Sequence, residues 1–219
     1  MSQQFEFVGS GLFLQPTPAG AYHAVASPEP SPERQLLLAT MRHHTSVRAT
    51  PETFAEWCGQ PVETALGTVH RAQEHGWLEG FHVPHGPAPG PLEPIAADAV
   101  QHLSSSGHGL LADGQGFCVA SHGFDTQQSE FLAAVSADIA SLHERHAAYL
   151  ADASGSTSSA WAMVDMAGNS RVGFWPLFVG RDRFVLALGG LPALNQSALV
   201  ELVWALIVRY GSDHFAAGG

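Results

Sequence analysis

The chain has 219 residues, which is enough for one large domain or two small ones. Hydrophobic residues make up 45% of it and charged residues 13%, a composition that excludes a globally disordered chain. All nine residues of fixed positive charge are arginines and the formal net charge is −11, which excludes lysine-dependent catalysis and disfavours nucleic acid or an anionic membrane as the main partner.

The cysteines, the N-terminal residues and the most apolar segment indicate the cellular location. The two cysteines, Cys58 and Cys118, form no disulfide framework, which is typical of a reducing compartment. The N-terminal residues do not combine a basic region with an apolar stretch, as a signal peptide does. The most apolar segment, ALVELVWALIV, contains Glu201 and is shorter than the roughly 20 residues of a membrane span. We therefore expect a soluble cytoplasmic protein that does not enter a membrane.

The first part of the chain, residues 1–82, predicts a small helical domain. Residues 11–27 have a Pro-Thr-Pro-Ala-Gly centre between apolar runs and predict a β-hairpin. Three helices follow, over 31–44, 50–59 and 61–76; the first two have Ser31 or Thr50 as the N-cap and a proline directly after it. Residues 77–81 predict a strand. Three short helices closed by a strand are typical of a winged-helix-like domain.

The segment 83–94 contains five prolines and two glycines. Such a segment cannot join a helix or a central strand, so it predicts a semi-rigid linker. It separates the winged-helix-like domain from a second domain, residues 95–219.

The second domain predicts a layered mixture of helices and strands. A helix within 92–106 is followed by a hairpin over 109–123, which turns at 113–116, and by a long helix over 126–150. Residues 159–190 predict three strands joined by tight turns at 167–170 and 180–183, and residues 193–211 predict a final helix. This order indicates an α/β sandwich with a five-stranded antiparallel sheet.

This C-terminal part resembles the Roadblock (dynein light-chain) family over about residues 91–215. The resemblance is carried by the hairpin GLLADGQGFCVASHG, the helix over 126–150, the meander SSAWAMVDMAGNSRVGFWPLFVGRDRFVLALGG and the aliphatic last helix. Members of the family form homodimers or heterodimers and bind or regulate small GTPases. The resemblance therefore implies a homodimer whose partner is a protein such as a small GTPase, and it carries over no catalytic residue. The winged-helix-like unit lies outside the usual single-domain form of the family.

The helix over 126–150 supplies the candidate interaction residues. Its apolar stripe, which suits packing on the sheet, consists of Phe131, Val135, Ile139 and Leu142. Its line of small residues, which permits close approach of another helix, consists of Ala133, Ala137, Ala140 and Ala148. Trp161 and Met163 suit an edge strand that pairs with a second copy. The small residues and these two strand residues form the predicted dimer interface; the alternative is that both helix faces belong to a monomer core.

No arrangement of reactive side chains indicates an enzyme. Cys118 and His122 lie four residues apart on one strand, about 13 Å and thus outside hydrogen-bond reach. The turn at 113–116 leads into a strand, whereas a phosphate site requires a helix N-terminus. Of the 13 histidines, His143 and His146 are three residues apart and lack zinc-site spacing. We therefore predict no catalytic residue, no cofactor and no metal.

Two functions are compatible with this organisation. The first is a non-enzymatic dimeric scaffold or regulator that binds or regulates a small GTPase, and the alternative is a winged-helix transcription regulator that binds DNA. Residues 1–82 contain four arginines and eight glutamates, a net charge of 4 − 8 = −4, and the third helix offers only Arg71 as a cation. Because phosphate contacts dominate DNA affinity, the sequence favours the first function.

Overall fold

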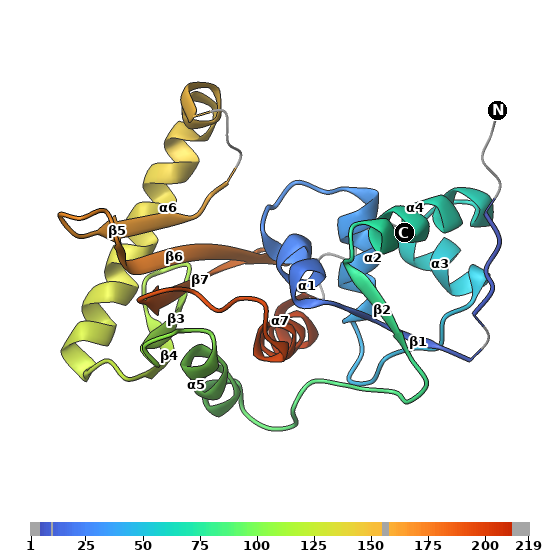
Figure 1. The fold of residues 1–219 in the computed structure, drawn as a ribbon, viewed down its shortest axis with the longest axis horizontal. Coiled ribbons are helices and arrows are strands. Elements are labelled where there is room, and N and C mark those ends of the chain that lie inside the picture. Colours follow the sequence, from blue (N-terminus) through green and yellow to red (C-terminus); the bar gives the residue numbers. More distant parts are fainter. Residues whose placement is uncertain (1–4, 10, 155–157, 212–219) are drawn as a thin grey trace.

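The protein has two parts that lie next to each other along its longest axis (Figure 1). The computed structural model describes residues 5–9, 11–154 and 158–211, so the end of the predicted domain 95–219 lies outside the described residues. In chain order the elements are β1 (Phe13–Pro16), α1 (Pro18–Val25), α2 (Pro32–Thr40), α3 (Pro51–Cys58), α4 (Val62–Glu74), β2 (Leu78–Phe81), α5 (Leu92–His102), β3 (Gly109–Asp113), β4 (Cys118–His122), α6 (Thr126–Ser154), β5 (Trp161–Val164), β6 (Ser170–Val179), β7 (Asp182–Gly189) and α7 (Ser197–Tyr210). Within the described ranges, no helix combines the length and the apolar character needed to cross a membrane.

Two helices of the N-terminal part begin with the predicted capping arrangement. Ser31 and Thr50 accept hydrogen bonds from the backbone N–H groups of Arg34 and Thr53, at 3.1 and 3.2 Å, and a proline follows each cap. Both predicted N-caps are confirmed. The α3 helix also ends as predicted, at Gly59, whose φ of 60° is the left-handed conformation that glycine adopts without strain.

The hairpin predicted over 11–27 is wrong in its second half. Only β1 is a strand, and the residues after Thr17 form α1. The Thr17 hydroxyl oxygen accepts from the backbone N–H of Gly20 at 3.1 Å, and Pro18 occupies the first helical position. The Pro-Thr-Pro-Ala-Gly sequence is therefore a helix start with the same signature as at Ser31, and not a turn.

The strand β1 pairs antiparallel with β2, from the Phe13–Phe81 pair to the Pro16–Leu78 pair. In the sequence, β1 precedes and β2 follows the four helices α1–α4, and the two strands form a two-stranded sheet. The strand predicted over 77–81 is thereby confirmed. The classification of this part as a winged-helix-like domain stays a prediction.

The proline-rich segment is fastened to the N-terminal part. The backbone N–H of Ser46 donates to the carbonyl of His85 at 2.7 Å, and the backbone N–H of His85 donates to the Ser46 hydroxyl at 3.0 Å. Helix α5 begins at Leu92, inside the range 83–94, because Pro94 stands in the first turn, where a missing N–H breaks no intrahelical bond. The domain boundaries themselves stay a prediction.

The C-terminal part is built on one five-stranded antiparallel sheet, with the order β4-β3-β7-β6-β5. The β3–β4 hairpin and the β5–β6–β7 meander meet where β3 pairs with β7. The β3–β4 and β5–β6 turns contain Gly116 and Gly168 at positive φ, a conformation that favours glycine. The predicted α/β sandwich with a five-stranded antiparallel sheet is confirmed.

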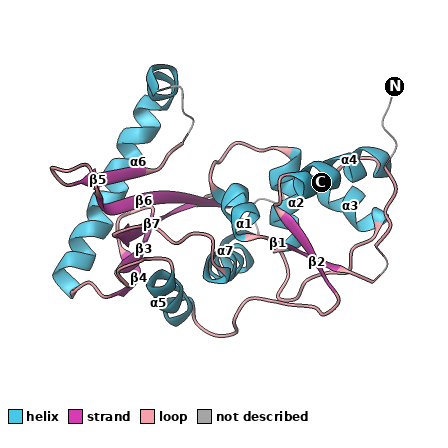
Figure 2. Cartoon of the chain, in the orientation of Figure 1, coloured by secondary structure: helices cyan, strands magenta, loops and turns pink. Residues whose placement is uncertain are grey.

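Different helices cover the two faces of this sheet (Figure 2). Side chains alternate along β7, so that Phe184, Leu186 and Leu188 join the core under α5 and α7. Val185 and Ala187 point to the opposite face and join a separate core under α6. The sheet is therefore the middle of three layers, with α6 alone on one side.

The core under α5 and α7 continues into the N-terminal part. Helix α1 packs against α7, and Ala21 and Ala24 belong to the same buried cluster as Leu199. The indole nitrogen of Trp204 donates a hydrogen bond to the carbonyl of His43 at 2.8 Å. The two parts are thus joined by apolar contact and by this hydrogen bond as well as by the linker.

We predict that Gly20→Ala destabilises the protein, although Gly→Ala in a helix is usually stabilising. A Cβ atom at Gly20 would lie 2.0 Å from the carbonyl oxygen of Trp77, and backbone cannot move aside as a side chain can. We expect a loss of about 1–3 kcal/mol in the free energy of unfolding, measured by urea denaturation.

The matched control is Gly67→Ala in α4. A Cβ atom there would meet its nearest neighbour, Phe5, at 3.5 Å, which is ordinary van der Waals contact. This variant should gain about 0.5–1 kcal/mol, because alanine restricts the unfolded chain. Equal effects of the two substitutions would contradict the packing of α1 on Trp77.

Candidate protein-interaction surface

Helix α6 starts at a defined cap and lies across one face of the sheet. The Asp125 carboxylate accepts from the backbone N–H of Gln128 at 2.7 Å, and the Gln128 side-chain oxygen accepts from the backbone N–H of Asp125 at 3.2 Å. This reciprocal pair satisfies N–H groups that a helix start otherwise leaves unpaired. It fixes where α6 begins and therefore which residues face the sheet.

The face of α6 that contacts the sheet is made mainly of small residues, together with Leu132. Ala133, Ser136 and Ala140 are 0%, 0% and 3% exposed. The alanines belong to the core that contains Phe174 of β6. The Ser136 hydroxyl donates to the carbonyl of Leu132 at 2.7 Å, so it is buried without an unpaired donor. Because these side chains are short, α6 lies close to the sheet while Phe174 fills the space between them.

The sequence-based assignment of the two helix faces is therefore wrong in part. Val135 and Ile139 are half-buried and pack against the core under α6, as predicted, whereas Phe131 and Leu142 are 63% and 40% exposed. Ala133 and Ala140, predicted to meet a second copy, are enclosed within the protomer and have no surface left for it.

The exposed apolar residues of α6 form a line along its outer side. Phe131, Leu142 and Tyr149 are separated by 11 and 7 residues, and at about 100° per residue such spacings return to nearly the same side of a helix. Asp138 and Arg145, both exposed, lie on the same outer side, at spacings of 7 residues from Phe131 and from each other. These charges are a signal in the sequence that could have identified the solvent-facing side of the helix.

The edge strand β5 carries further exposed apolar residues. It pairs with β6 on one side, and no other strand of the described chain pairs with its second side (Figure 1). Met163 is 45% exposed and Val164 62%. The pairing of Trp161 with Phe174 and of Met163 with Val172 places both side chains on the face of the sheet that α6 covers.

Two polar contacts hold α6 beside β5 and β7. The indole nitrogen of Trp161 donates to Nδ1 of His143 at 3.2 Å, which leaves the hydrogen of this histidine on Nε2. On the other side of the helix, the Arg183 guanidinium pairs with the Glu144 carboxylate. Trp161 thus helps to position α6 within the protomer. Of the two predicted strand residues, Met163 is the one with more surface free to contact another molecule.

The remaining predicted interface residues occupy different environments. Ala137 is half-buried, and its Cβ atom lies 3.2 Å from where a Cβ atom on Gly116, in the β3–β4 turn, would stand. A large side chain at Ala137 would therefore disturb the protomer itself. Ala148 is exposed near the end of α6. The structure consequently brings Ala148 and Met163 to the surface, together with Phe131 and Leu142, which the sequence-based interface omitted.

Neither thiol is activated. Burial raises the pKa of Cys58 to about 11, and burial is also the main cause of the raised pKa of Cys118. Both side chains are therefore protonated near neutral pH, whereas the thiolate is the reactive form. The Nδ1–H of His122 donates to the carbonyl of Gly107, 2.8 Å away. Within the described residues, no group of three or more His, Cys, Asp or Glu side chains could hold a metal ion.

Comparison with known proteins shows similarity in structure. No family model matches the sequence, and no curated protein matches it either. A Roadblock/LC7 domain from Streptomyces avermitilis is similar in structure, with 16% identity over 55% of this chain and 93% of that chain and a TM-score of 0.35. The gliding protein MglB from Thermus thermophilus shares 17% identity over 57% and 94%, with a TM-score of 0.34. MglB from Myxococcus xanthus shares 15% identity over 58% and 90%, with a TM-score of 0.32.

Proposed function

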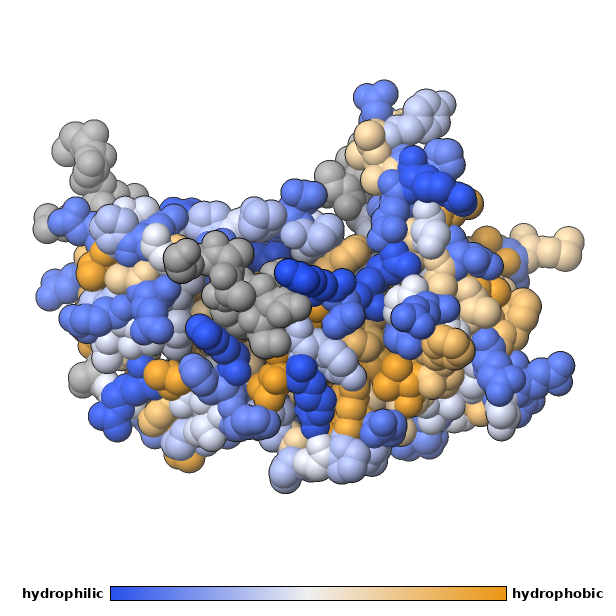
Figure 3. Space-filling model, turned by 180° about the vertical axis from the view of Figure 1, so that it is seen from behind, coloured by the Kyte–Doolittle hydropathy of each residue, from blue (hydrophilic) through white to orange (hydrophobic). Residues whose placement is uncertain are grey.

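We propose that this protein is a non-enzymatic scaffold or regulator that forms a homodimer through α6 and β5. The observation that carries the proposal is the apolar line on the outer side of α6 next to an unpaired strand edge. When the molecule is viewed from behind, apolar side chains are frequent over the half that holds the sheet, whereas the projecting end of α6 is mainly hydrophilic (Figure 3). Large apolar side chains gathered on one side of a protein mark interaction sites.

The edge strand supports self-association in particular. Natural edge strands are usually protected by charged side chains or prolines, which prevent pairing with another chain. The sequence of β5 is Trp-Ala-Met-Val and contains neither, and Ala162, Met163 and Val164 are exposed. Pairing two β5 strands across a twofold axis would satisfy their free backbone groups and would bring the two α6 helices to the same side of a continuous sheet.

A small GTPase is the partner class that we propose for the dimer. The sequence resemblance to the Roadblock family implies this class. The net charge of −11 suits a partner with a basic surface, because opposite potentials accelerate association. The dimer would act by binding, since neither thiol is activated and no catalytic arrangement was found in the sequence.

The DNA-binding alternative receives no support from the geometry of α4. Arg71 is paired with Glu33, with 2.8 Å between Nη2 and Oε1, and His70 lies 3.3 Å from the Glu74 carboxylate. The cation available on this helix is thus already neutralised, so it cannot contribute the counterion release on which DNA affinity depends.

The dimer is tested by the double substitution Leu142→Glu and Met163→Glu. Both side chains are exposed in the protomer, so the fold should be retained. Dimerisation, by contrast, would bury two unpaired carboxylates per protomer, which is unfavourable. We expect the dissociation constant to rise at least about a hundredfold, measured by sedimentation equilibrium.

The matched control is Val83→Glu with Leu191→Glu, which introduces the same charges at residues that are 63% and 68% exposed and lie outside α6 and β5. This control should dimerise like the wild type. A Leu142→Glu/Met163→Glu variant that dimerises normally, or a wild type that stays monomeric at about 100 μM, well within the range of weak transient complexes, would contradict the proposed interface.

The partner class is tested by the rate of GTP hydrolysis. Small GTPases from the same organism are purified and assayed with and without the protein. We expect one of them to change its rate by at least about tenfold, which is about 1.4 kcal/mol in the activation free energy, and the Leu142→Glu/Met163→Glu variant to have a weaker effect. Unchanged hydrolysis rates for every small GTPase of the organism would exclude small GTPases as the partner class, but they would not contradict the proposed dimer.

A further inference from the structure

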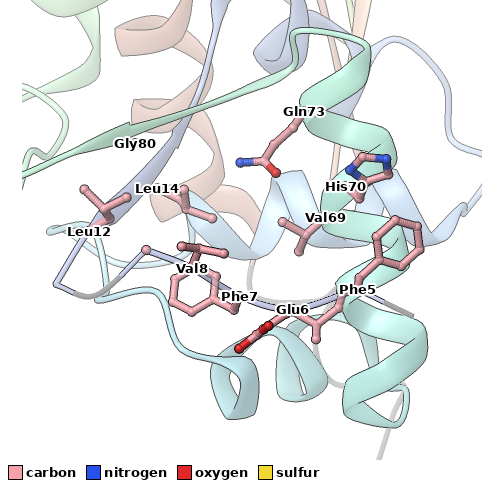
Figure 4. A pocket seen from close by; sticks show the side chains of 12 residues that line it. Phe5, Glu6, Phe7, Val8, Leu12, Leu14, Val69, His70, Gln73 and Gly80 are labelled. Carbon is pink, nitrogen blue, oxygen red and sulfur yellow. The ribbon is translucent and has the colours of Figure 1, made fainter. Parts of the chain in front are cut away.

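The first described residues, Phe5–Gly9, cross the surface of α4 without joining any secondary structure. The ring of Phe7 meets the ring of Phe54, which is fully buried, edge to face at a centroid distance of 5.3 Å. The ring of Phe5 lies 4.5 Å from the ring of His70 on α4. Figure 4 shows Phe5 beside His70 and Phe7 on the opposite side of Glu6, towards Leu12. We refer to residues 5–9 as the strap.

The strap is held by these side chains alone. Among the described residues, no hydrogen bond or ion pair joins residues 5–9 to the rest of the chain. Glu6 and Val8 point outward, and Val8 is 90% exposed. Inward-facing and outward-facing side chains alternate along the strap, as they do in an extended chain, in which residues two apart share one face.

The strap also leaves the groove beneath it incompletely filled. A cavity of about 300 Å³ remains between the strap, α4 and the β1–β2 sheet. Apart from the strap and His70, its lining consists of Leu12, Leu14, Leu66, Val69, Gln73 and Gly80. This cavity is partly open to solvent. The strap therefore occupies the groove only in part, and its backbone does not pair with the β1–β2 sheet.

We propose that this groove is a docking site for an extended segment of a partner protein with aromatic side chains two residues apart, and that the strap occupies it in cis. The strap indicates the chemistry of the partner segment. Phe5 and Phe7 pack on the apolar wall of the groove, while Glu6 faces solvent. The partner must displace the strap, so its apparent affinity is reduced by the fraction of molecules in which the groove is closed. The site lies in the N-terminal part, away from α6 and β5, and it does not depend on the proposed dimer.

The probe is a fluorescent peptide with the strap's own sequence, QFEFVGS, and the full-length chain is used throughout. In the variant Phe5→Ser/Phe7→Ser the strap can no longer fill the groove. We expect this variant to bind the peptide at least about tenfold more tightly than the wild type does, measured by fluorescence anisotropy. The peptide QSESVGS should bind neither protein.

The groove itself is tested by adding Gly67→Leu to the double variant. A Cβ atom on Gly67 points at the position of the Phe5 ring, 3.5 Å from its Cε2 atom, so a leucine there would occupy the place of the incoming aromatic side chain. This substitution should abolish the gain in affinity, whereas Leu142→Glu/Met163→Glu should leave peptide binding unchanged. If Phe5→Ser/Phe7→Ser loses its helical circular dichroism, the same comparisons are made with Phe5→Ser alone, since Phe5 packs on the surface of α4.

The proposal is overturned if the folded variant binds QFEFVGS no more tightly than the wild type, or if Gly67→Leu has no effect on binding. Its assignment of the partner is also overturned if wild type and Phe5→Ser/Phe7→Ser, both carrying Leu142→Glu/Met163→Glu so that they cannot dimerise through α6 and β5, still form a mixed oligomer in sedimentation experiments, because a second copy would then occupy the groove.

Discussion

The close approach of α6 to the sheet determines what the C-terminal part can offer to another molecule. Short side chains at Ala133, Ser136 and Ala140 bring the helix backbone near Phe174, and this contact sets the rotation of α6 about its own axis. Once that rotation is set, Phe131 and Leu142 must face away from the sheet. The apolar surface beside β5 is therefore a direct consequence of packing on the other side of the helix.

A second constraint comes from the core that the two parts share. Because α1 packs on α7 and Trp204 bonds to the carbonyl of His43, the N-terminal part has a fixed position on the C-terminal part. The strap and its groove therefore lie at a defined distance from α6 and β5, on a different part of the surface. One protomer could thus bind a second copy through one surface and an aromatic segment through the other without competition between them.

Local signals in the sequence predicted most of the fold. The N-caps at Ser31 and Thr50 and the glycine at Gly59 act through neighbouring backbone groups, so three or four residues suffice to identify them. The same reasoning failed at Thr17, because prolines on both sides of it are compatible with a turn as well as with a helix start. The tight turns of the sheet were predictable for the same local reason as the caps.

The candidate site was less predictable, since it depends on contacts between distant residues. A period of 3.6 residues identifies α6 as a helix with two unlike faces, but only the sheet decides which face is covered. Phe131 was predicted to lie in the core because large apolar residues are usually buried. In α6, the close approach of the helix to the sheet instead favours alanine on the buried face. The bond between Trp161 and His143, 18 residues apart, and the docking of the strap on α4 likewise have no local signature.

The backbone amides of β5 test the central claim most directly. If two copies pair through this edge, the free amides of β5 become hydrogen-bonded only in the dimer, and their exchange with deuterium should slow markedly when the protein concentration is raised above the dissociation constant. The amides of β4, at the opposite edge of the sheet, should exchange at the same rate at both concentrations. Equal exchange of β5 below and above the dissociation constant would contradict the account.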